Sequence, residues 1–283
     1  MWWCLGLLTI SLLSWSLFST CRVLYPERKS IPAPQPLPSY TCHPLLTPEG
    51  EVFDVWLLED PSPRARVLIC HGYYADRYQV LTLAQRLREH HYEVLLCELR
   101  GHGSRPGPCT LGVKERDDAA LVLRWARTRA DTPSLPVGIL GFSMGAAVAC
   151  QVAANIPDIR AVVVDSIYAR LFPVLARVIH ERYHLPSSLW AWITWWSLEL
   201  TLRRRLALND PVHLASQLRQ PLLAIQGGKD QRVAPELRSE FYQRWAGPKE
   251  QWADPSVGHV GMFAKHPDAY VNRVVDFFNR TLT

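Results

Sequence analysis

The stretch Val137–Val148, V-G-I-L-G-F-S-M-G-A-A-V, changes character twice within a dozen residues. The apolar residues Val137–Leu140 predict the end of a buried strand, Gly141–Gly145 predicts a sharp turn, and Ala146 begins a helical pattern. A serine at the apex of such a turn is pushed out of the backbone, with its hydroxyl exposed over the positive end of the helix. The stretch therefore matches a G-x-S-x-G nucleophile elbow, with Ser143 as the candidate nucleophile.

The two glycines of this turn have a steric purpose. A side chain at Gly141 or Gly145 would collide with the neighbouring strand and helix at so tight a bend. Five loosely specified positions recur by chance, so the motif alone is weak evidence. The strand, turn and helix around it are what make it specific.

A serine hydroxyl is a poor nucleophile until an imidazole takes its proton, and the imidazole needs a carboxylate to fix its tautomer. Both groups follow downstream. Asp230 ends the strand and Gly-rich turn L-L-A-I-Q-G-G-K-D, and His259 lies between glycines in a late loop. Asp165 also follows a predicted strand and is the alternative acid, but the Gly-rich turn lets the chain at Asp230 bend back toward His259. The predicted catalytic residues are Ser143, Asp230 and His259.

The oxyanion formed during acyl transfer needs preorganised N–H donors. His71-Gly72-Tyr73 directly follows an early buried strand, so the backbone N–H of Tyr73 can point into the site. Met144 follows the nucleophile and supplies a second N–H at the start of the helix. Tyr73 and Met144 are therefore the predicted oxyanion hole.

These four features together resemble the α/β-hydrolase superfamily, from about residue 47 to the end of the chain. Leu99–Ser104, L-R-G-H-G-S, is similar to the family's R-G-x-G-x-S turn, in which His102 would be structural. Asp165-Ser166 is similar to the D-S of single-anchor members with a membrane-bound N-terminal helix. The resemblance implies hydrolysis of esters, thioesters or amides, often of acyl chains.

The rest of the chain alternates predicted strands with predicted helices. Strands are expected at 52–58, 66–70, 94–97, 161–164 and 222–225, and helices at 81–89, 117–129, 235–245 and 269–279. This alternation predicts an α/β-hydrolase fold, with a mostly parallel central sheet and helices on both faces.

A Trp-rich stretch interrupts this alternation inside a predicted helical cap at about residues 170–210. On a helix, one face would carry Trp190, Ile193, Trp196 and Leu200, and another would carry Trp192, Trp195 and Glu199. We expect the first face to cover the site above Ser143 and the second to lie at its rim. The rim tryptophans and Arg203–Arg205 suit a lipid interface, although the tryptophans could equally pack onto the sheet.

Residues 1–21 contain no charged side chain and are rich in Trp, Leu and Ile, which predicts a membrane anchor over residues 1–24. A cleaved signal peptide is the alternative, but no Lys or Arg precedes the apolar run and no small-x-small cleavage site follows it. Arg22, Arg28 and Lys29 all follow the uncharged run of residues 1–21. The positive-inside rule therefore predicts a single-pass protein with a cytoplasmic catalytic domain, with export as the alternative.

The remaining domain boundaries follow from composition. The run P-A-P-Q-P-L-P at 32–38 marks a semi-rigid linker over residues 25–46, and the hydrolase domain is predicted over residues 47–283. A net charge of +5 suits an anionic membrane surface and is too small to indicate nucleic acid. Seven cysteines without a C-x-x-C pair argue against a disulfide framework and a zinc finger.

One motif points to different chemistry. His180-Glu181-Arg182-Tyr183-His184 matches H-E-x-x-H, which on a helix presents two imidazoles to zinc with the glutamate as base. Zinc would need a third ligand, and Glu199, beyond a helix break at Pro186, is the nearby candidate. With ten histidines in the chain a chance match is unsurprising, so we predict no metal and keep a zinc metallopeptidase as a minor alternative.

The sequence thus predicts a serine hydrolase of carboxylic esters or thioesters that needs no cofactor. Its substrates are expected to be small-molecule or lipid-like acyl compounds, cleaved through a Ser-His-Asp triad and an acyl-enzyme. An acyltransferase or a serine peptidase would use the same triad, and a non-catalytic binding module would share the fold. No predicted triad position is substituted, which disfavours the binding module.

Overall fold

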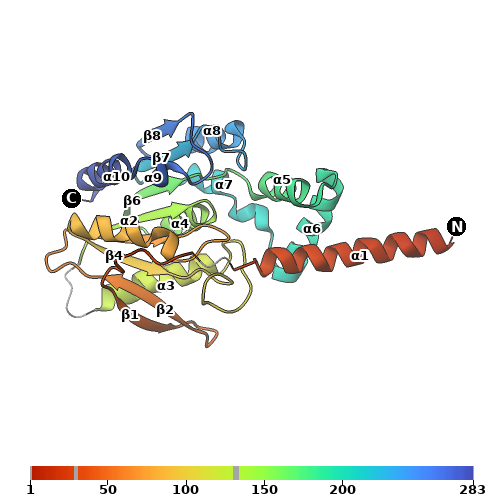
Figure 1. The fold of residues 1–283 in the computed structure, drawn as a ribbon, viewed down its shortest axis with the longest axis horizontal. Coiled ribbons are helices and arrows are strands. Elements are labelled where there is room, and N and C mark those ends of the chain that lie inside the picture. Colours follow the sequence, from red (N-terminus) through yellow and green to blue (C-terminus); the bar gives the residue numbers. More distant parts are fainter. Residues whose placement is uncertain (1, 29–30, 130–133, 283) are drawn as a thin grey trace.

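The computed structural model describes residues 2–28, 31–129 and 134–282, so Lys29 of the predicted linker lies outside them. Its centre is a sheet that comprises, within these ranges, eight strands in the order β1-β2-β4-β3-β5-β6-β7-β8 (Figure 1). The strands are β1 (Thr41–Leu46), β2 (Val52–Leu58), β3 (Ala65–Cys70), β4 (Tyr92–Cys97), β5 (Val137–Phe142), β6 (Ile159–Asp165), β7 (Leu222–Gly227) and β8 (Lys249–Asp254). From β4 to β8 the neighbours are parallel, whereas β1 and β2 are antiparallel at one edge. The predicted mostly parallel sheet is confirmed.

The strands that could be predicted from the sequence are mainly those that the structure buries on both faces. Every residue of β3, β4, β5 and β7 is buried, as expected for strands covered on both faces. The two edge strands, β1 and β8, were not predicted. Pro44 lies within β1, and β8 reads K-E-Q-W-A-D, so neither has the apolar run of an interior strand. The structure thus places part of the predicted linker range in the sheet.

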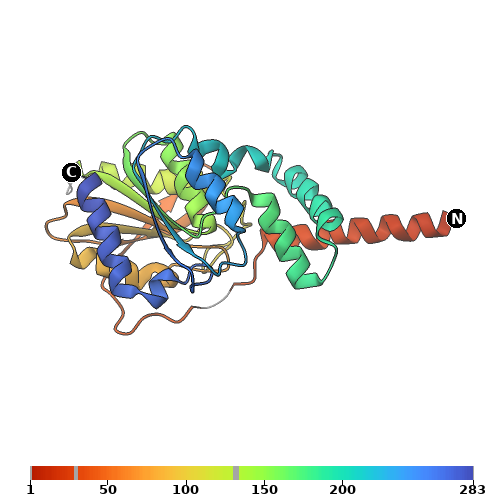
Figure 2. The same cartoon turned by 90° about the horizontal axis from the view of Figure 1, so that it is seen from above.

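Helices cover both faces of the sheet, as predicted (Figures 1 and 2). One face packs against α3 (Glu115–Thr128), α4 (Met144–Asn155), α7 (Pro211–Ala215) and α8 (Pro235–Arg244). The other packs against α2 (Tyr78–Glu89), α9 (Met262–Lys265) and α10 (Pro267–Thr281). The two apolar cores formed in this way hold the sheet rigid, so that the loops after its strands have fixed positions.

The cap lies between β6 and β7. It consists of α5 (Leu171–Tyr183), α6 (Ser187–Leu202) and the short 3₁₀ helix η1 (Leu206–Asn209). The N-terminal helix α1 (Trp2–Leu24) lies beside α6, and its first turns project away from the sheet (Figures 1 and 2). The cap is therefore built from two segments far apart in the chain.

The predicted membrane-spanning anchor is not supported. No helix within the described residues is long and apolar enough to cross a bilayer. The cytoplasmic location of the catalytic domain was inferred from the predicted span. It therefore stays a prediction and loses the support of a membrane-spanning helix.

The C-terminal half of α1 has a different set of contacts. The Trp15 indole N–H lies 3.2 Å from the Trp190 carbonyl oxygen of α6. The Thr20 hydroxyl donates to the Ser197 hydroxyl oxygen at 2.7 Å. The hydroxyl groups of Ser19 and Thr20 thus connect α1 to α6 of the cap.

Candidate active site

Ser143 sits at the turn between β5 and α4 with a φ of 50°, in the left-handed region that non-glycine residues rarely adopt. A Cβ added at Gly141 would overlap the Gly145 carbonyl oxygen, and one added at Gly145 would overlap the Cys70 carbonyl oxygen. The predicted steric role of both glycines is therefore confirmed. The turn presents the Ser143 hydroxyl at the carboxyl edge of the sheet, above the start of α4.

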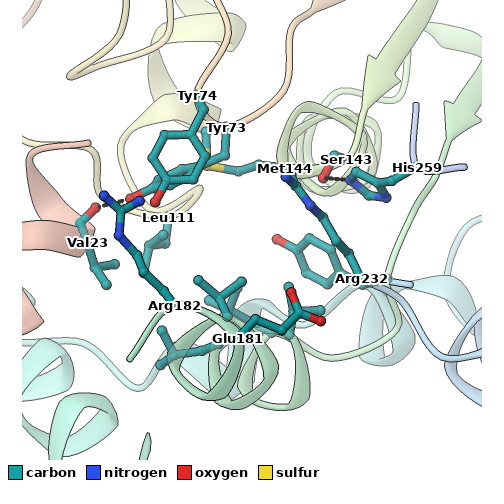
Figure 3. A pocket seen from close by; sticks show the side chains of 15 residues that line it. Val23, Tyr73, Tyr74, Leu111, Ser143, Met144, Glu181, Arg182, Arg232 and His259 are labelled. Atoms are coloured by element: carbon teal, nitrogen blue, oxygen red, sulfur yellow. Dashed lines mark hydrogen bonds between the residues drawn. The ribbon is translucent and has the colours of Figure 1, made fainter. Parts of the chain in front are cut away.

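The structure brings Ser143, His259 and Asp230 together. His259 Nε2 lies 2.9 Å from Ser143 Oγ (Figure 3). His259 Nδ1 lies 2.7 Å from Asp230 Oδ2. A carboxylate at Nδ1 holds the imidazole proton there, so Nε2 is left to accept the serine proton. The geometry is that required for activating a serine hydroxyl.

Asp230 is held by its own turn as well. Its Oδ1 accepts the backbone N–H groups of Arg232 at 2.9 Å and Val233 at 3.1 Å. Burial raises the pKa of Asp230, but the hydrogen bond and charge of His259, with these N–H groups, outweigh it and hold the pKa below its usual value. The carboxylate is therefore ionised at neutral pH and oriented toward the imidazole.

Asp165, the alternative acid, has a different set of partners. It is fully buried at the end of β6, where Ser166 Oγ–H donates to Oδ1 at 2.9 Å and Tyr270 O–H donates to Oδ2 at 3.1 Å. Burial raises the pKa of Asp165 to about 6, because the hydrogen bonds only partly compensate for desolvation. His259 is paired with Asp230 and not with this carboxyl group.

The two predicted oxyanion donors both line the pocket beside Ser143. Met144 is the first residue of α4, so its N–H is among those that have no acceptor within the helix. Tyr73 lies on the loop after β3, and its phenol donates to the Val23 carbonyl oxygen of α1 at 2.7 Å. The sequence did not reveal this link between α1 and the loop.

A buried polar network supports the Tyr73 loop and was also missed. The Glu98 carboxylate accepts both the Arg77 backbone N–H, at 3.0 Å, and the Arg77 side-chain Nε–H, at 3.1 Å. His71 Nε2 lies 3.0 Å from the Leu99 backbone nitrogen and 3.3 Å from Glu98 Oε1, so this ring joins the same carboxylate to the loop after β4. Burial raises the pKa of Glu98, but His71 and Arg77 outweigh it and lower the pKa below its usual value. The network fixes the backbone that carries Tyr73.

His102 is structural, as the resemblance implied. Its ring is buried against Tyr73, with centroids 5.3 Å apart, and its Nδ1–H donates to the Arg100 carbonyl oxygen at 2.8 Å. Burial lowers the pKa of His102 to about 4. The ring is therefore neutral at physiological pH and packs behind the loop that carries Tyr73.

Ser143 and His259 open into an apolar pocket of about 300 Å³ (Figure 3). This volume is at the lower end of the range for small-molecule sites. Four apolar residues of α5 form one wall, namely Leu171, Val174, Leu175 and Val178. Glu181, Arg182 and Arg232 are its charged lining residues. The pocket thus suits an apolar group attached to the carbonyl that Ser143 would attack.

The prediction of which face of α6 (Ser187–Leu202) covers the site is wrong. Trp196 and Leu200, expected to cover the site, are 63% and 80% exposed, whereas Trp195, expected at the rim, is only 4% exposed. The pocket is lined by α5 instead. Trp195 packs edge-on against Phe172 of α5, and α1 occupies the side of α6 that carries Trp190. The packing of α1 and α5 against α6 thus determined which residues are buried.

The H-E-x-x-H residues do not converge. Helix α5 ends at Tyr183, and His184 has a left-handed φ of 53°, so it leaves the helical face of His180. Glu181 accepts the Arg177 Nε–H at 2.9 Å. Within the described residues, no group of three or more His, Cys, Asp or Glu side chains is arranged to hold a metal ion.

With this geometry in place, comparison with known proteins identifies relatives of the chain. A family model described as "Serine aminopeptidase, S33" matches residues 61–166, which include Tyr73, Ser143 and Met144. An uncharacterized protein of Mycobacterium tuberculosis is 31% identical over 220 residues, covering 77% of this chain and 69% of that protein. The uncharacterized protein YqkD of Bacillus subtilis is 26% identical over 216 residues, covering 75% of this chain and 70% of that protein.

Solved structures show the same fold. The Pyrococcus furiosus esterase Pf2001 superposes with a TM-score of 0.75 at 25% identity, covering 93% of this chain and 98% of the esterase. An acylaminoacyl peptidase of Pyrococcus horikoshii superposes with a TM-score of 0.64 at 16% identity, covering 88% of this chain and 43% of the peptidase. The second likeness concerns the fold alone.

Proposed function

Because this chain belongs to the α/β-hydrolase superfamily, we propose that it is a serine hydrolase that cleaves carboxylic esters or thioesters of apolar acyl groups. The observation that carries the proposal is the hydrogen-bonded chain Ser143–His259–Asp230, of which Ser143 and His259 line an apolar pocket. Fold alone does not imply activity, whereas a nucleophile, a base and an orienting acid in contact support the proposal of a specific chemistry.

The reaction follows from the contacts. Ser143 Oγ attacks the carbonyl carbon while its proton moves to His259 Nε2, and the Asp230 carboxylate stabilises the imidazolium. The Tyr73 and Met144 N–H groups receive the oxyanion. His259 then gives the proton to the departing alcohol or thiol, leaving an acyl-enzyme. A water molecule attacks that ester in the same way, with His259 again as base, and releases the acid.

The pocket supports an apolar acyl group in particular. Each buried CH₂ contributes about 0.8 kcal/mol, which is about fourfold in kcat/KM if the chain is held equally in the transition state. A series of p-nitrophenyl esters of increasing chain length should therefore show kcat/KM rising until the pocket is full. A preference for acetate over longer chains would contradict this substrate class.

Covalent labelling tests the nucleophile. A fluorophosphonate should form an adduct on Ser143, and Ser143→Ala should lower kcat by about 10⁶-fold and lose the adduct. Ser256→Ala is the matched control, because Ser256 is an exposed serine of the loop that precedes His259 and should keep both. Labelling of Ser143→Ala at the rate of the unchanged protein would overturn the proposal.

The family description favours a serine aminopeptidase as a second candidate. Such an enzyme needs a carboxylate in the pocket to pair with the ammonium group of the peptide. Glu181 lines the pocket but is paired with Arg177, while Arg182 and Arg232 add positive charge. Acyl esters should therefore be hydrolysed better than aminoacyl p-nitroanilides. The opposite order of kcat/KM would favour the peptidase.

An acyltransferase would differ only in the second half of the reaction, where an alcohol replaces water. Adding a series of alcohols to a reaction with an acyl ester separates the two, because the acyl-enzyme partitions between acceptors. For a hydrolase, free acid should remain the main product.

A further inference from the structure

The two residues Asp165 and Ser166, at the end of β6, lie between the Ser143 turn and the His259 loop. The Ser143 backbone N–H donates to the Asp165 carbonyl oxygen at 2.9 Å. The Val260 backbone N–H, next to His259, donates to Ser166 Oγ, also at 2.9 Å. One dipeptide therefore contacts both segments whose side chains would exchange the proton.

The Ser166 hydroxyl is fixed in direction by its other partner. Its proton is donated to Asp165 Oδ1 at 2.9 Å, which leaves an oxygen lone pair for the Val260 N–H. Asp165 Oδ2 in turn accepts the Tyr270 O–H of α10 at 3.1 Å. Asp165, Ser166 and Tyr270 are all fully buried, so water cannot replace these bonds.

The joined segments have backbone conformations that need support. Ser143, Ser166 and Val260 have φ values of 50°, 57° and 55°, all in the left-handed region. Left-handed backbone is least favourable for a β-branched residue such as Val260. Conformations of this kind persist only where surrounding contacts over-determine them, and the Ser166 hydroxyl provides such a contact at Val260.

We propose that Ser166 and Asp165 are positioning residues, which hold the His259 loop at the distance and angle from Ser143 that proton transfer requires. The inference rests on the proposed serine hydrolase. Ser166 acts through the Val260 backbone, and Asp165 acts by orienting the Ser166 hydroxyl. Neither group touches the substrate, because neither lines the pocket.

The role differs from that of a triad acid in a measurable way. In Asp165→Asn the amide oxygen can still accept the Ser166 proton, so the contact with Val260 is kept and kcat should change by no more than about threefold. In Ser166→Ala the Val260 N–H loses its acceptor, and the cost of an unsatisfied donor corresponds to a fall in kcat of about 10- to 100-fold. KM should stay within about twofold, since the apolar wall on α5 is untouched.

The decisive experiment measures kcat, KM, the rate of fluorophosphonate labelling and thermal stability for the full chain and a set of variants. The variants are Ser166→Ala, Asp165→Asn, Tyr270→Phe, Asp230→Asn and Ser256→Ala. Ser166→Ala should lower kcat and the labelling rate in parallel, and Tyr270→Phe should do so less, because it removes only a bond to Asp165. Ser256→Ala removes a hydroxyl from the same loop and should match the unchanged protein.

Two results would overturn the inference. If Ser166→Ala lowers the melting temperature while kcat and labelling stay within twofold, the contact is structural only. If Asp165→Asn loses as much activity as Asp230→Asn, then Asp165 is a triad acid and not a positioning residue. In both cases Ser143 would still be labelled in the unchanged protein. Absence of labelling there would instead refute the proposed function.

Discussion

The carboxyl edge of the sheet and the helical cap are held together by different kinds of contact. At the edge, single polar atoms meet at 2.7–2.9 Å, as between Asp230, His259 and Ser143. In the cap, aromatic rings pack with centroids 4.2–5.4 Å apart, as between Phe172 and the two residues Trp192 and Trp195. Hydrogen bonds depend on direction as well as distance, whereas apolar packing depends on volume and area. We therefore expect the edge to be sensitive to isosteric changes and the cap to changes of size.

The largest effect at the edge outside the nucleophile itself should come from Asp230→Asn. This change preserves shape and removes the charge that fixes the His259 tautomer, so kcat should fall by up to about 10⁴-fold. Steady-state hydrolysis of an acyl ester measures it, and circular dichroism checks that the fold is kept. A loss of only a few-fold would mean that the edge tolerates an isosteric change, which would remove the contrast with the cap.

In the cap, exposure should decide the effect of removing a ring. Trp195 is 4% exposed, so Trp195→Ala should cost about 3–5 kcal/mol of unfolding free energy. Trp196 is its neighbour and is 63% exposed, so Trp196→Ala should stay within about 0.5 kcal/mol. Urea denaturation of both variants measures the difference. Equal losses would show that the buried face of α6 has been assigned incorrectly.

The two buried acids of the edge should respond to pH with opposite signs. Burial raises the pKa of Asp165 to about 6, so its ionisation above that pH destabilises the folded protein. The protonated Asp165 carboxyl group contributes fully to stability below the pKa of the unfolded state, and this contribution is lost as the pH rises through about 6. Asp230 has a lowered pKa, mainly because the His259 hydrogen bond outweighs its burial, so its contribution is present at neutral pH and is lost as the pH falls.

Unfolding free energies between pH 2 and pH 8 test this difference. Relative to the unchanged protein, Asp165→Asn should become more stable by ~1–3 kcal/mol as the pH rises through 6. The groups facing Asp165 are Ser166, Tyr270, His259 and Asp230, and they remain in the variant. Asp230→Asn should lose relative stability as the pH rises through about 4, the unfolded pKa of an aspartate, and its difference curve should be level above that. Two difference curves of the same sign would contradict the assignment of the two carboxyl groups.

The edge was also the region that the sequence described best, for a physical reason. The Ser143 turn depends on glycines two residues away on either side, and Asp230 and His259 each lie in a turn with its own glycines. Such signals are local and can be read from neighbouring residues. The contact between Ser166 and Val260 spans 94 residues, and that between Tyr73 and Val23 spans 50, so no local pattern revealed either.

The cap shows why helical periodicity was insufficient to predict which face of a helix is buried. Helix α6 carries apolar residues on every side, so the period identified a helix without identifying its buried face. That face depends on α1, which arrives from the other end of the chain and contacts the side that carries Trp190. The pocket wall was missed for the same reason, because Val174 and Val178 of α5 became lining residues only through the placement of the cap.

The smallest expected effect concerns the H-E-x-x-H residues of α5, whose two imidazoles could share a metal only if both lay on one helical face. His184 has left the helix, His180 Nδ1 lies 3.0 Å from the Leu185 carbonyl oxygen, and Glu181 is paired with Arg177. Prolonged treatment with a chelator, and the His180→Ala variant, should therefore leave ester hydrolysis within twofold of the untreated protein. If the activity were lost to the chelator and restored by zinc, the catalytic residues would lie in the cap and not at the edge of the sheet. That result would favour a zinc metallopeptidase over the serine hydrolase.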